Sequence, residues 1–261
     1  MPVGYGAAAM DSEKFAPGTV IERRDLAHDL WVIKVRCEAE LPFRPGQYAT
    51  IGVPVDGKLI ERPYSIVSSP EEPALELFIE LVPEGELTPH LYPLDVGAPL
   101  VLRRKTKGLF LRGAPIDAED HLFVATVTGI APFTSLLRLL ARRWRDGEWT
   151  TERRIILLVG ASRSFEFGYL EEMRALEAEL PWFDFLPTVS RPWEDPEWTG
   201  ETGRVEDVLR KHADRLGIAP GSAGVYLCGH PEMIRNARGI MLRAGLDDKA
   251  IREEQYWPEG K

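Results

Sequence analysis

The sequence predicts two modules in series: an antiparallel β-barrel followed by an α/β domain with a doubly wound parallel sheet. The first half consists of short apolar runs broken by proline and glycine, which is typical of antiparallel barrels. The second half alternates strand-like and helix-like apolar runs, the pattern of a parallel sheet with helices on both faces. The two patterns meet between residues 113 and 118.

In the first half, strands are expected at residues 30–36, 47–53, 74–82 and 99–104. Residues 86–94 are long enough for a helix, but two prolines limit any helix there to a short piece.

In the second half, strands are expected at residues 121–127, 154–160, 183–190 and 224–229, and helices at 131–144, 168–180, 205–216 and 231–245. We therefore predict a flexible N-terminal arm over residues 1–16, the barrel domain over 17–113 and the α/β domain over 114–261.

Composition narrows the class of protein. The 261 residues are 44% hydrophobic and 28% charged, as in soluble globular proteins. A net charge of −9 disfavours a nucleic-acid partner. No apolar run reaches the roughly 18 residues of a membrane span. The N-terminus lacks the features of a secretory signal. Met10 is a second candidate for the start of the chain. We expect a cytoplasmic protein with no membrane partner. Two cysteines cannot hold a zinc or iron–sulfur site alone, so no metal is expected.

The stretch ERPYSIVSSP, residues 61–70, places a cation, a ring and a hydroxyl on neighbouring positions. In a strand, Arg62 and Tyr64 point to one face and Ser65 to the other. The alternative is a hairpin edge whose polarity arises by chance.

Three arginines, Arg163, Arg191 and Arg204, lie just after predicted strands or just before a helix. A guanidinium group suits phosphate because it donates two parallel hydrogen bonds. One loop arginine is usually a solvated surface residue, but three at one sheet edge favour a phosphate site. The turn TVTGIAPF, residues 126–133, lets backbone N–H groups approach an anion, or is an ordinary strand-to-helix connection.

The segment YLCGHPEMI, residues 226–234, ends a strand in Cys228 and Gly229. Glycine there permits close approach of a planar ligand; the alternative is a plain strand–turn–helix connection with an inert thiol. Tyr256 and Trp257 near the C-terminus either cap a strand edge or cover a planar cofactor.

From about residue 17 to its end, the chain resembles the bacterial branch of the ferredoxin–NADP⁺ reductase family. The matching segments are PFRPGQY (42–48), RPYS (62–65), VPEGELTPHL (82–91), TGIAPF (128–133), TVSR (188–191) with TGR (202–204), CGHPEMI (228–234) and the final YW. The resemblance implies that the barrel binds FAD non-covalently, that the α/β domain binds NADP(H), and that the C-terminal tail returns to the flavin.

The resemblance also implies roles for single residues. On the FAD side, Arg62 binds the pyrophosphate, Tyr64 packs on the ring system with Pro63 beside it, and Ser65 lies near flavin N5. Other expected FAD residues are Phe78, Ile79, Glu80 and Leu81 along the flavin, Gly85, Glu86, Leu87 and Thr88 in the phosphate turn, Thr128, and the aromatic pair Tyr256 and Trp257. The expected NADP residues are Arg163, Ser190, Arg191, Arg204, Cys228 and Gly229. Ser65, Cys228 and Glu254 are the catalytic candidates. Val127 stands where the family normally has glycine.

The function implied is an FAD-dependent oxidoreductase that exchanges a hydride with NADP(H) and single electrons with ferredoxin or flavodoxin, as a monomer. One alternative is an NAD(P)H-dependent flavin reductase component that serves an oxygenase or another dedicated acceptor. Another is a regulatory or electron-transfer subunit that binds FAD without hydride exchange. The basic run LRRKTK, residues 102–107, either docks an acidic carrier protein or only solvates a strand end. The sequence does not identify the carrier, the direction of electron flow or the redox potentials.

Overall fold

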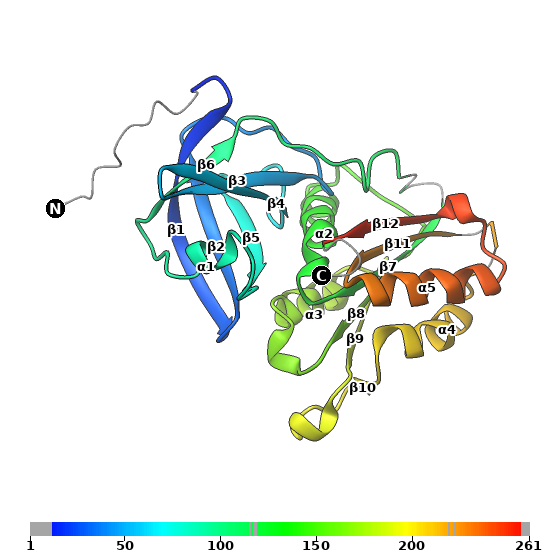
Figure 1. Cartoon of the computed structure of the whole chain (residues 1–261). Helices are drawn as coiled ribbons and strands as arrows, with labels where there is room; N and C mark the ends of the chain where they lie inside the picture. The colour runs from blue at the N-terminus through cyan, green and yellow to red at the C-terminus, as the bar shows by residue number, and fades with distance from the viewer. Residues whose placement is uncertain (1–11, 115, 117–118, 219, 222, 257–261) are drawn as a thin grey trace.

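The computed structural model describes residues 12–114, 116, 119–218, 220–221 and 223–256. Two units, each built on a six-stranded sheet, lie side by side (Figure 1). The first sheet is antiparallel and the second is parallel, which confirms the predicted fold class.

The first sheet has the strand order β4-β3-β6-β1-β2-β5. Its strands are β1 (Phe15–Ala27), β2 (Leu30–Cys37), β3 (Tyr48–Val55), β4 (Lys58–Ser65), β5 (Leu75–Glu80) and β6 (Pro99–Arg103), and the one-turn helix α1 spans Thr88–Leu91. A bridge between Ile66 and Leu77 joins the chain after β4 to β5, so the two outer strands meet and the sheet closes into a barrel. Strand β1 includes the last two residues of the predicted arm.

The β3–β4 hairpin turns at Asp56 and Gly57, which have φ of 49° and 78°. Asp-Gly with positive φ at both positions is a preferred two-residue hairpin turn, because its twist matches that of the flanking strands.

The second sheet has the order β10-β9-β8-β7-β11-β12. Its strands are β7 (Asp120–Thr126), β8 (Ile155–Ala161), β9 (Phe183–Val189), β10 (Glu201–Thr202), β11 (Ala223–Gly229) and β12 (Ile251–Gln255), and its helices are α2 (Ala131–Arg145), α3 (Leu170–Glu179), α4 (Val205–Arg215) and α5 (Pro231–Arg243). Short 3₁₀ helices are η1 (Val127–Ile130), η2 (Ser164–Glu166), η3 (Pro192–Glu194) and η4 (Asp248–Ala250).

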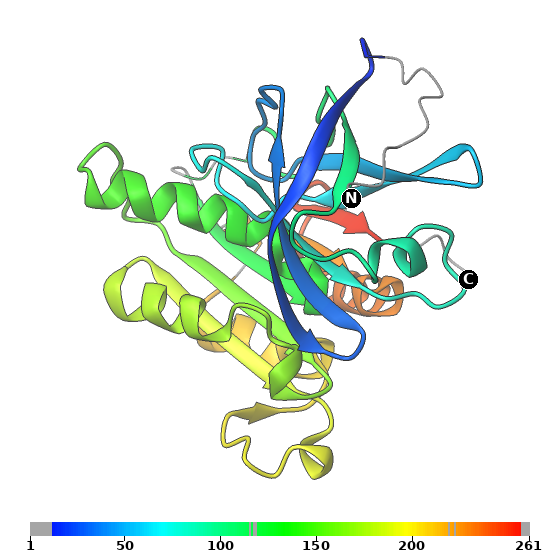
Figure 2. The ribbon, with the colours of Figure 1, turned by 90° about the vertical axis from the view of Figure 1, so that its left-hand side faces the viewer.

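Apolar side chains cover both faces of this sheet. Helices α2 and α3 pack on one face in a core that continues into barrel residues such as Phe78, while α4 and α5 pack on the other face (Figures 1 and 2). Strands β7 and β11 are neighbours at the centre, and the chain winds outward from them in both directions. Ligands of doubly wound sheets bind at this switch point, beyond the carboxyl ends of the strands.

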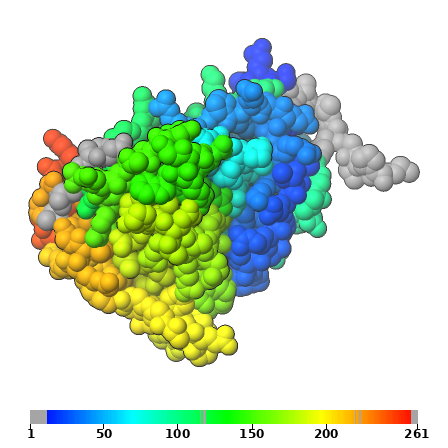
Figure 3. Space-filling view, turned by 180° about the vertical axis from the view of Figure 1, so that it is seen from behind, coloured from blue at the N-terminus to red at the C-terminus, as the bar shows by residue number. Residues whose placement is uncertain are grey.

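A buried charge network fixes the barrel to the α/β unit. Arg138 on α2 lies 3.0 Å from a carboxylate oxygen of Glu76 on β5 and 2.6 Å from one of Glu172 on α3. The Tyr169 hydroxyl donates a 2.7 Å hydrogen bond to Glu76. Burial alone would raise the pKa of Glu76, but Arg138 and Tyr169 hold it below its usual value. The surfaces of the two units meet along a continuous boundary (Figure 3).

Among the described residues, no helix is both long and apolar enough to cross a membrane.

Candidate functional site

Ser65 and Glu254 meet although 189 positions separate them in the sequence. The Ser65 hydroxyl, at the end of β4, donates a 2.9 Å hydrogen bond to Glu254 Oε1 on β12. Strand β12 pairs in parallel with β11, and Glu254 lies opposite Cys228 in that register. The phenol of Tyr256 donates a 3.4 Å hydrogen bond to the carbonyl oxygen of Thr128. The structure thus brings all three catalytic candidates to one corner between the two units.

Burial sets the protonation of this corner. It raises the pKa of the Cys228 thiol well above its usual value, and the nearby Glu254 carboxylate raises it further. Burial also raises the pKa of Glu254, an effect that the Ser65 hydrogen bond opposes. A neutral thiol is a poor nucleophile, so the corner can hold or transfer a proton at Glu254 but has no thiolate for covalent catalysis.

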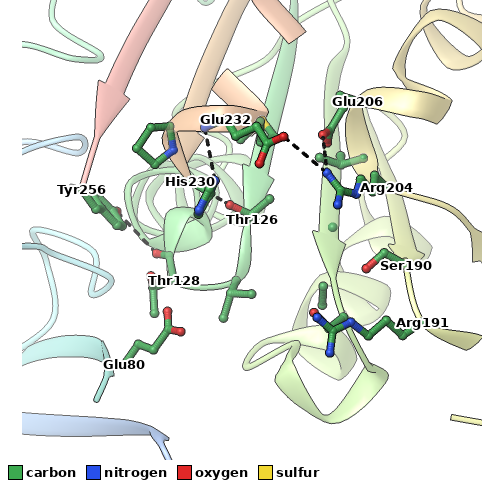
Figure 4. Close-up of a pocket in the computed structure, with 18 of the residues that line it drawn as sticks. Glu80, Thr126, Thr128, Ser190, Arg191, Arg204, Glu206, His230, Glu232 and Tyr256 are labelled. Atoms are coloured by element: carbon green, nitrogen blue, oxygen red, sulfur yellow. Dashed lines mark hydrogen bonds and ion pairs between the residues drawn. The ribbon is translucent and has the colours of Figure 1, made fainter. Parts of the chain in front are cut away.

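A cleft of about 1000 Å³ begins beside this corner and follows the carboxyl ends of the parallel strands (Figure 4). Its volume is at the upper end of typical ligand pockets. Glu80 and Tyr256 line one end, and Ser190, Arg191 and Arg204 line the other. The two ends of the cleft are therefore lined by different side chains, which suits an extended ligand whose own two ends differ chemically.

Of the arginines that line the cleft, Arg191 and Arg204 have only distant acidic partners. Arg204 Nη1 lies 3.7 Å from Glu232 Oε1 and 3.9 Å from Glu206 Oε1, and Arg191 Nη1 lies 3.9 Å from Glu194 Oε1. Their side chains are 49% (Arg191) and 61% (Arg204) exposed, so their N–H donors remain available to an anion.

Arg163 differs from these two arginines. Its guanidinium lies 3.0 Å from Glu166 Oε1 and also pairs with Glu194, and it is not among the residues that line the cleft. It connects η2 to η3 and so supports the loop that carries Arg191.

The turn after β7 is packed tightly against the end of β11. A Cβ atom on Gly129 would lie 2.3 Å from the Cys228 carbonyl oxygen, and one on Gly229 would lie 2.2 Å from Thr126 Oγ1. The backbone N–H of His230 donates a 2.9 Å hydrogen bond to that Thr126 oxygen. Glycine is therefore required at both positions, and the two loops form one rigid edge of the cleft.

On the barrel, Arg62 is half-exposed on β4 and pairs with Glu86, which is 70% exposed. A phosphate group can displace so exposed a carboxylate. Tyr64 is partly buried next to Arg62, and burial raises its pKa above the usual value. A half-exposed cation beside a partly buried ring fits a ligand with an anionic group and a planar group, as FAD has. Pro63 lies exposed between them.

Several of the predicted FAD residues point their side chains elsewhere. The Thr88 hydroxyl accepts a 2.9 Å hydrogen bond from Val82 N and donates one of 3.0 Å to Val82 O, which closes the 82–88 turn around Gly85. Phe78 packs edge-on against Tyr169, with ring centroids 5.6 Å apart. Ile79 and Leu87 are buried in the barrel core, and Leu81 packs against it. Any cofactor contact by these residues would involve the main chain. Trp257 lies outside the described residues.

Some residues that line the cleft were not named as site residues from the sequence. Thr126, Val127, His230, Glu232 and Met233 lie in the segments 126–133 and 226–234 that were considered, whereas Ser162, Trp193, Glu206 and Arg235 lie outside them. Most of them follow a strand or begin a helix, so the rule that ligands bind beyond the carboxyl ends of strands would have identified them. Among the described residues, no cluster of three or more His, Cys, Asp or Glu side chains is arranged to hold a metal ion.

Two family models match the chain, the oxidoreductase FAD-binding domain over residues 17–106 and the oxidoreductase NAD-binding domain over residues 123–239. The first corresponds to the barrel and the second to the α/β unit.

Relatives and solved structures agree with these matches. A flavodoxin/ferredoxin–NADP reductase of Shigella flexneri is 30% identical over 203 residues, which cover 76% of this chain and 78% of the relative. The phenol 2-monooxygenase reductase component DmpP of Pseudomonas sp. (strain CF600) is 30% identical over 92% of this chain but only 65% of its own length. A ferredoxin NADP⁺ reductase structure from Neisseria gonorrhoeae, with bound FAD and NADP, has the same fold, with a TM-score of 0.80 and 23% identity over 94% of this chain and 99% of that chain.

Proposed function

The chain belongs to the ferredoxin–NADP⁺ reductase family of FAD- and NAD(P)-dependent oxidoreductases, and from this premise we propose that it exchanges a hydride with NADP(H) and single electrons with ferredoxin or flavodoxin. Bound FAD would supply the chemistry that links two-electron and one-electron transfer. The protein's own residues would bind and orient the flavin and the nucleotide and would exclude water from the site.

The observation that carries the proposal is the polarity of the cleft. One end meets the Ser65–Glu254 corner, and the other end presents Arg191 and Arg204. NADP(H) has a nicotinamide ring at one end and a 2′-phosphate at the other, so the two ends of the ligand match the two ends of the cleft. A 2′-phosphate is a dianion that two guanidinium groups can bind with charge-assisted hydrogen bonds.

In this proposal Arg62 binds the FAD pyrophosphate and Tyr64 packs against the flavin ring system. The Ser65 hydroxyl lies near the reacting edge of the ring, and the Glu254 carboxyl holds a proton there. Cys228 remains a neutral thiol that leaves room for the nicotinamide at the end of β11. Tyr256 covers the site from the C-terminus.

The test is anaerobic addition of nicotinamide nucleotides to the purified yellow protein. NADPH is expected to bleach the flavin absorbance quickly, whereas NADH at the same concentration acts slowly. Equal rates with both nucleotides would contradict the NADP(H) assignment, and absence of a releasable flavin would contradict FAD binding.

A second candidate is the reductase component of an oxygenase, because DmpP and the phenol hydroxylase P5 protein of Acinetobacter pittii are about as similar to this chain as the ferredoxin reductases are. The chain spans about two thirds of the length of these two proteins. Reduction assays with ferredoxin and flavodoxin from the same genome separate the two functions, since an oxygenase reductase would reduce neither efficiently.

A further inference from the structure

Val127, at the start of η1, has φ of +42°. Apart from Asp56, it is the only non-glycine residue with positive φ in the described part of the chain. A β-branched side chain in this left-handed region is a genuine outlier, because its Cβ is forced close to the backbone. Such strained residues persist only where the surrounding structure imposes them, and they gather at functional sites.

The neighbours of Val127 impose its conformation. Thr126 before it is fixed by the hydrogen bond from His230 N, and Gly129 after it lies against the Cys228 carbonyl. The Thr126 hydroxyl holds one side of the turn to His230, and the Gly129 backbone holds the other side against the end of β11, so Val127 cannot relax to negative φ without separating these segments.

Val127 also lines the cleft, between Thr126 and Thr128. Its side chain is partly buried and packs against the same core cluster as Tyr256. Thr128, the next residue, accepts the hydrogen bond from Tyr256, and Thr126 and Thr128 lie on the Tyr256 side of the cleft, away from Arg191 and Arg204 (Figure 4). Glycine would satisfy this backbone without strain and would leave the turn open to close approach by a ligand.

We propose that Val127 is a specificity-determining residue of the nucleotide cleft, whose isopropyl group limits how closely the pyrophosphate and nicotinamide half of a dinucleotide approaches the β7–α2 turn. The proposal rests on the proposed function, since the ligand is NADP(H). The isopropyl group weakens the hold on that half of the nucleotide while the adenosine half is bound at the arginines. The strained backbone is the consequence of placing this bulk at a position that requires positive φ.

Two variants separate bulk from strain. Val127→Gly removes both, whereas Val127→Ala removes most of the bulk and keeps a side chain at positive φ. We expect both variants to bind NADP⁺ more tightly than the wild-type holoenzyme by roughly tenfold, the lower end of what a methylene-sized change does in a pocket. Only Val127→Gly should also melt at a higher temperature.

Calorimetric titration of oxidised holoenzyme with NADP⁺ and with adenosine 2′,5′-bisphosphate measures these effects without turnover. The bisphosphate lacks the nicotinamide half, so its affinity should be the same in all variants. Asp56→Gly is the matched control, because Asp56 has φ of 49° in the exposed β3–β4 hairpin and does not line the cleft. It should leave NADP⁺ affinity unchanged.

The proposal is overturned if both Val127 variants bind NADP⁺ with wild-type affinity while the bisphosphate binds normally. A Val127→Gly protein that melts below Val127→Ala would remove the strain argument. Failure of the wild-type protein to bind the bisphosphate would instead overturn the proposed NADP(H) function. Should Val127→Gly not retain FAD, Val127→Ala tests the role of bulk alone.

Discussion

At the scale of single residues, Glu254 shows how burial and one hydrogen bond determine the chemistry available to a carboxyl group. Burial disfavours its charged form and raises its pKa, while the Ser65 hydroxyl stabilises the carboxylate and opposes the increase. Of the two, burial has the larger effect, so Glu254 is better suited to carry a proton than an exposed glutamate is. The nearby Cys228 thiol is kept neutral by the same burial.

Glu254→Gln should therefore change the pH dependence of stability. Because the pKa of Glu254 is raised in the folded state, its contribution to stability is complete below the pKa of an unfolded glutamate and is lost as pH rises through the folded pKa. Glutamine does not titrate and can still accept the Ser65 hydrogen bond. The variant should therefore gain free energy of unfolding over the wild type as pH rises from about 4.3, the pKa of an unfolded glutamate, through the folded pKa, by about 1.4 kcal/mol for each unit by which the pKa is raised. Urea denaturation at several pH values measures this gain. If the free energies of unfolding of the variant and the wild type change with pH in the same way, the pKa of Glu254 is not raised.

At the scale of elements, the terminal strand β12 supplies the third side of the site. Of its five residues only Ile251 is fully buried, while Glu254 is partly buried, and the strand exists because it pairs with β11. Tyr256 follows directly and contacts the Thr128 carbonyl. The position of this ring thus depends on pairing at the edge of the sheet.

Deleting residues 256–261 should loosen FAD or tighten nicotinamide nucleotide binding. Aromatic stacking contributes roughly 0.5–1.5 kcal/mol beyond area burial, enough to hold a covering ring that a nucleotide can displace. A chain that ends at Tyr256 is the control, because it retains the phenol and its contact with Thr128. Fluorescence titration of FAD and NADP⁺ provides both affinities. Identical values for the two truncated proteins would mean that Tyr256 does not contribute.

The elements that the sequence predicted are those with continuous apolar runs. Strands β7, β8, β9 and β11 and helices α2 to α5 lie close to their expected ranges because both faces of this sheet are covered. Strand β12 was not predicted, since its charges hide it from any search for apolar patterns. Strand β1 was not predicted either, because its residues alternate between buried and exposed only in its first half.

The site was predictable to the extent that it follows the ends of strands. Ser190, Arg191, Arg204 and Gly229 do so, and the structure brings them into one cleft. The Ser65–Glu254 contact depends on how the two units pack, and residue spacing contains no information on it; only the family resemblance suggested that both lie near the flavin. The positive φ of Val127 and the acidic partners of Arg163 are likewise tertiary effects.

At the scale of the whole molecule, exposed lysines lie beside the Ser65–Glu254 corner of a protein with a net charge of −9. Ser65 pairs with Tyr48, and Tyr48 bridges to Lys107, so Lys107 lies about 10 Å from Ser65, two strand spacings away. Lys105 and Lys107 are exposed, and the neighbouring Leu109 is 67% exposed. Arg103, in contrast to these lysines, forms an ion pair with Glu61. An apolar residue among exposed cations suits an acidic carrier protein.

Reversing Lys105 and Lys107 to Glu should slow reduction of an acidic carrier by roughly tenfold or more at low ionic strength, the range over which electrostatic steering changes association rates. Reduction of a small neutral dye by NADPH should not change. Reversal of Arg243 and Lys249, which are exposed at the end of α5 and in η4 away from the barrel (Figure 1), introduces the same charge and is the control. Equal loss with both pairs would indicate an effect of net charge alone.

The most direct test of hydride exchange with NADP(H) in this cleft is the rate of flavin reduction by NADPH relative to NADH, for the wild type and for the Arg191→Ala/Arg204→Ala double variant. Each guanidinium contact with a phosphate contributes about 1.5–3 kcal/mol, so the double variant should lose NADPH preference by at least roughly tenfold and keep its NADH rate. Arg142→Ala/Arg143→Ala on α2 removes equal charge from side chains of similar exposure, 57% and 46%, and should leave the ratio unchanged. An unchanged ratio in the Arg191/Arg204 variant, or equal losses with both nucleotides, would contradict the account.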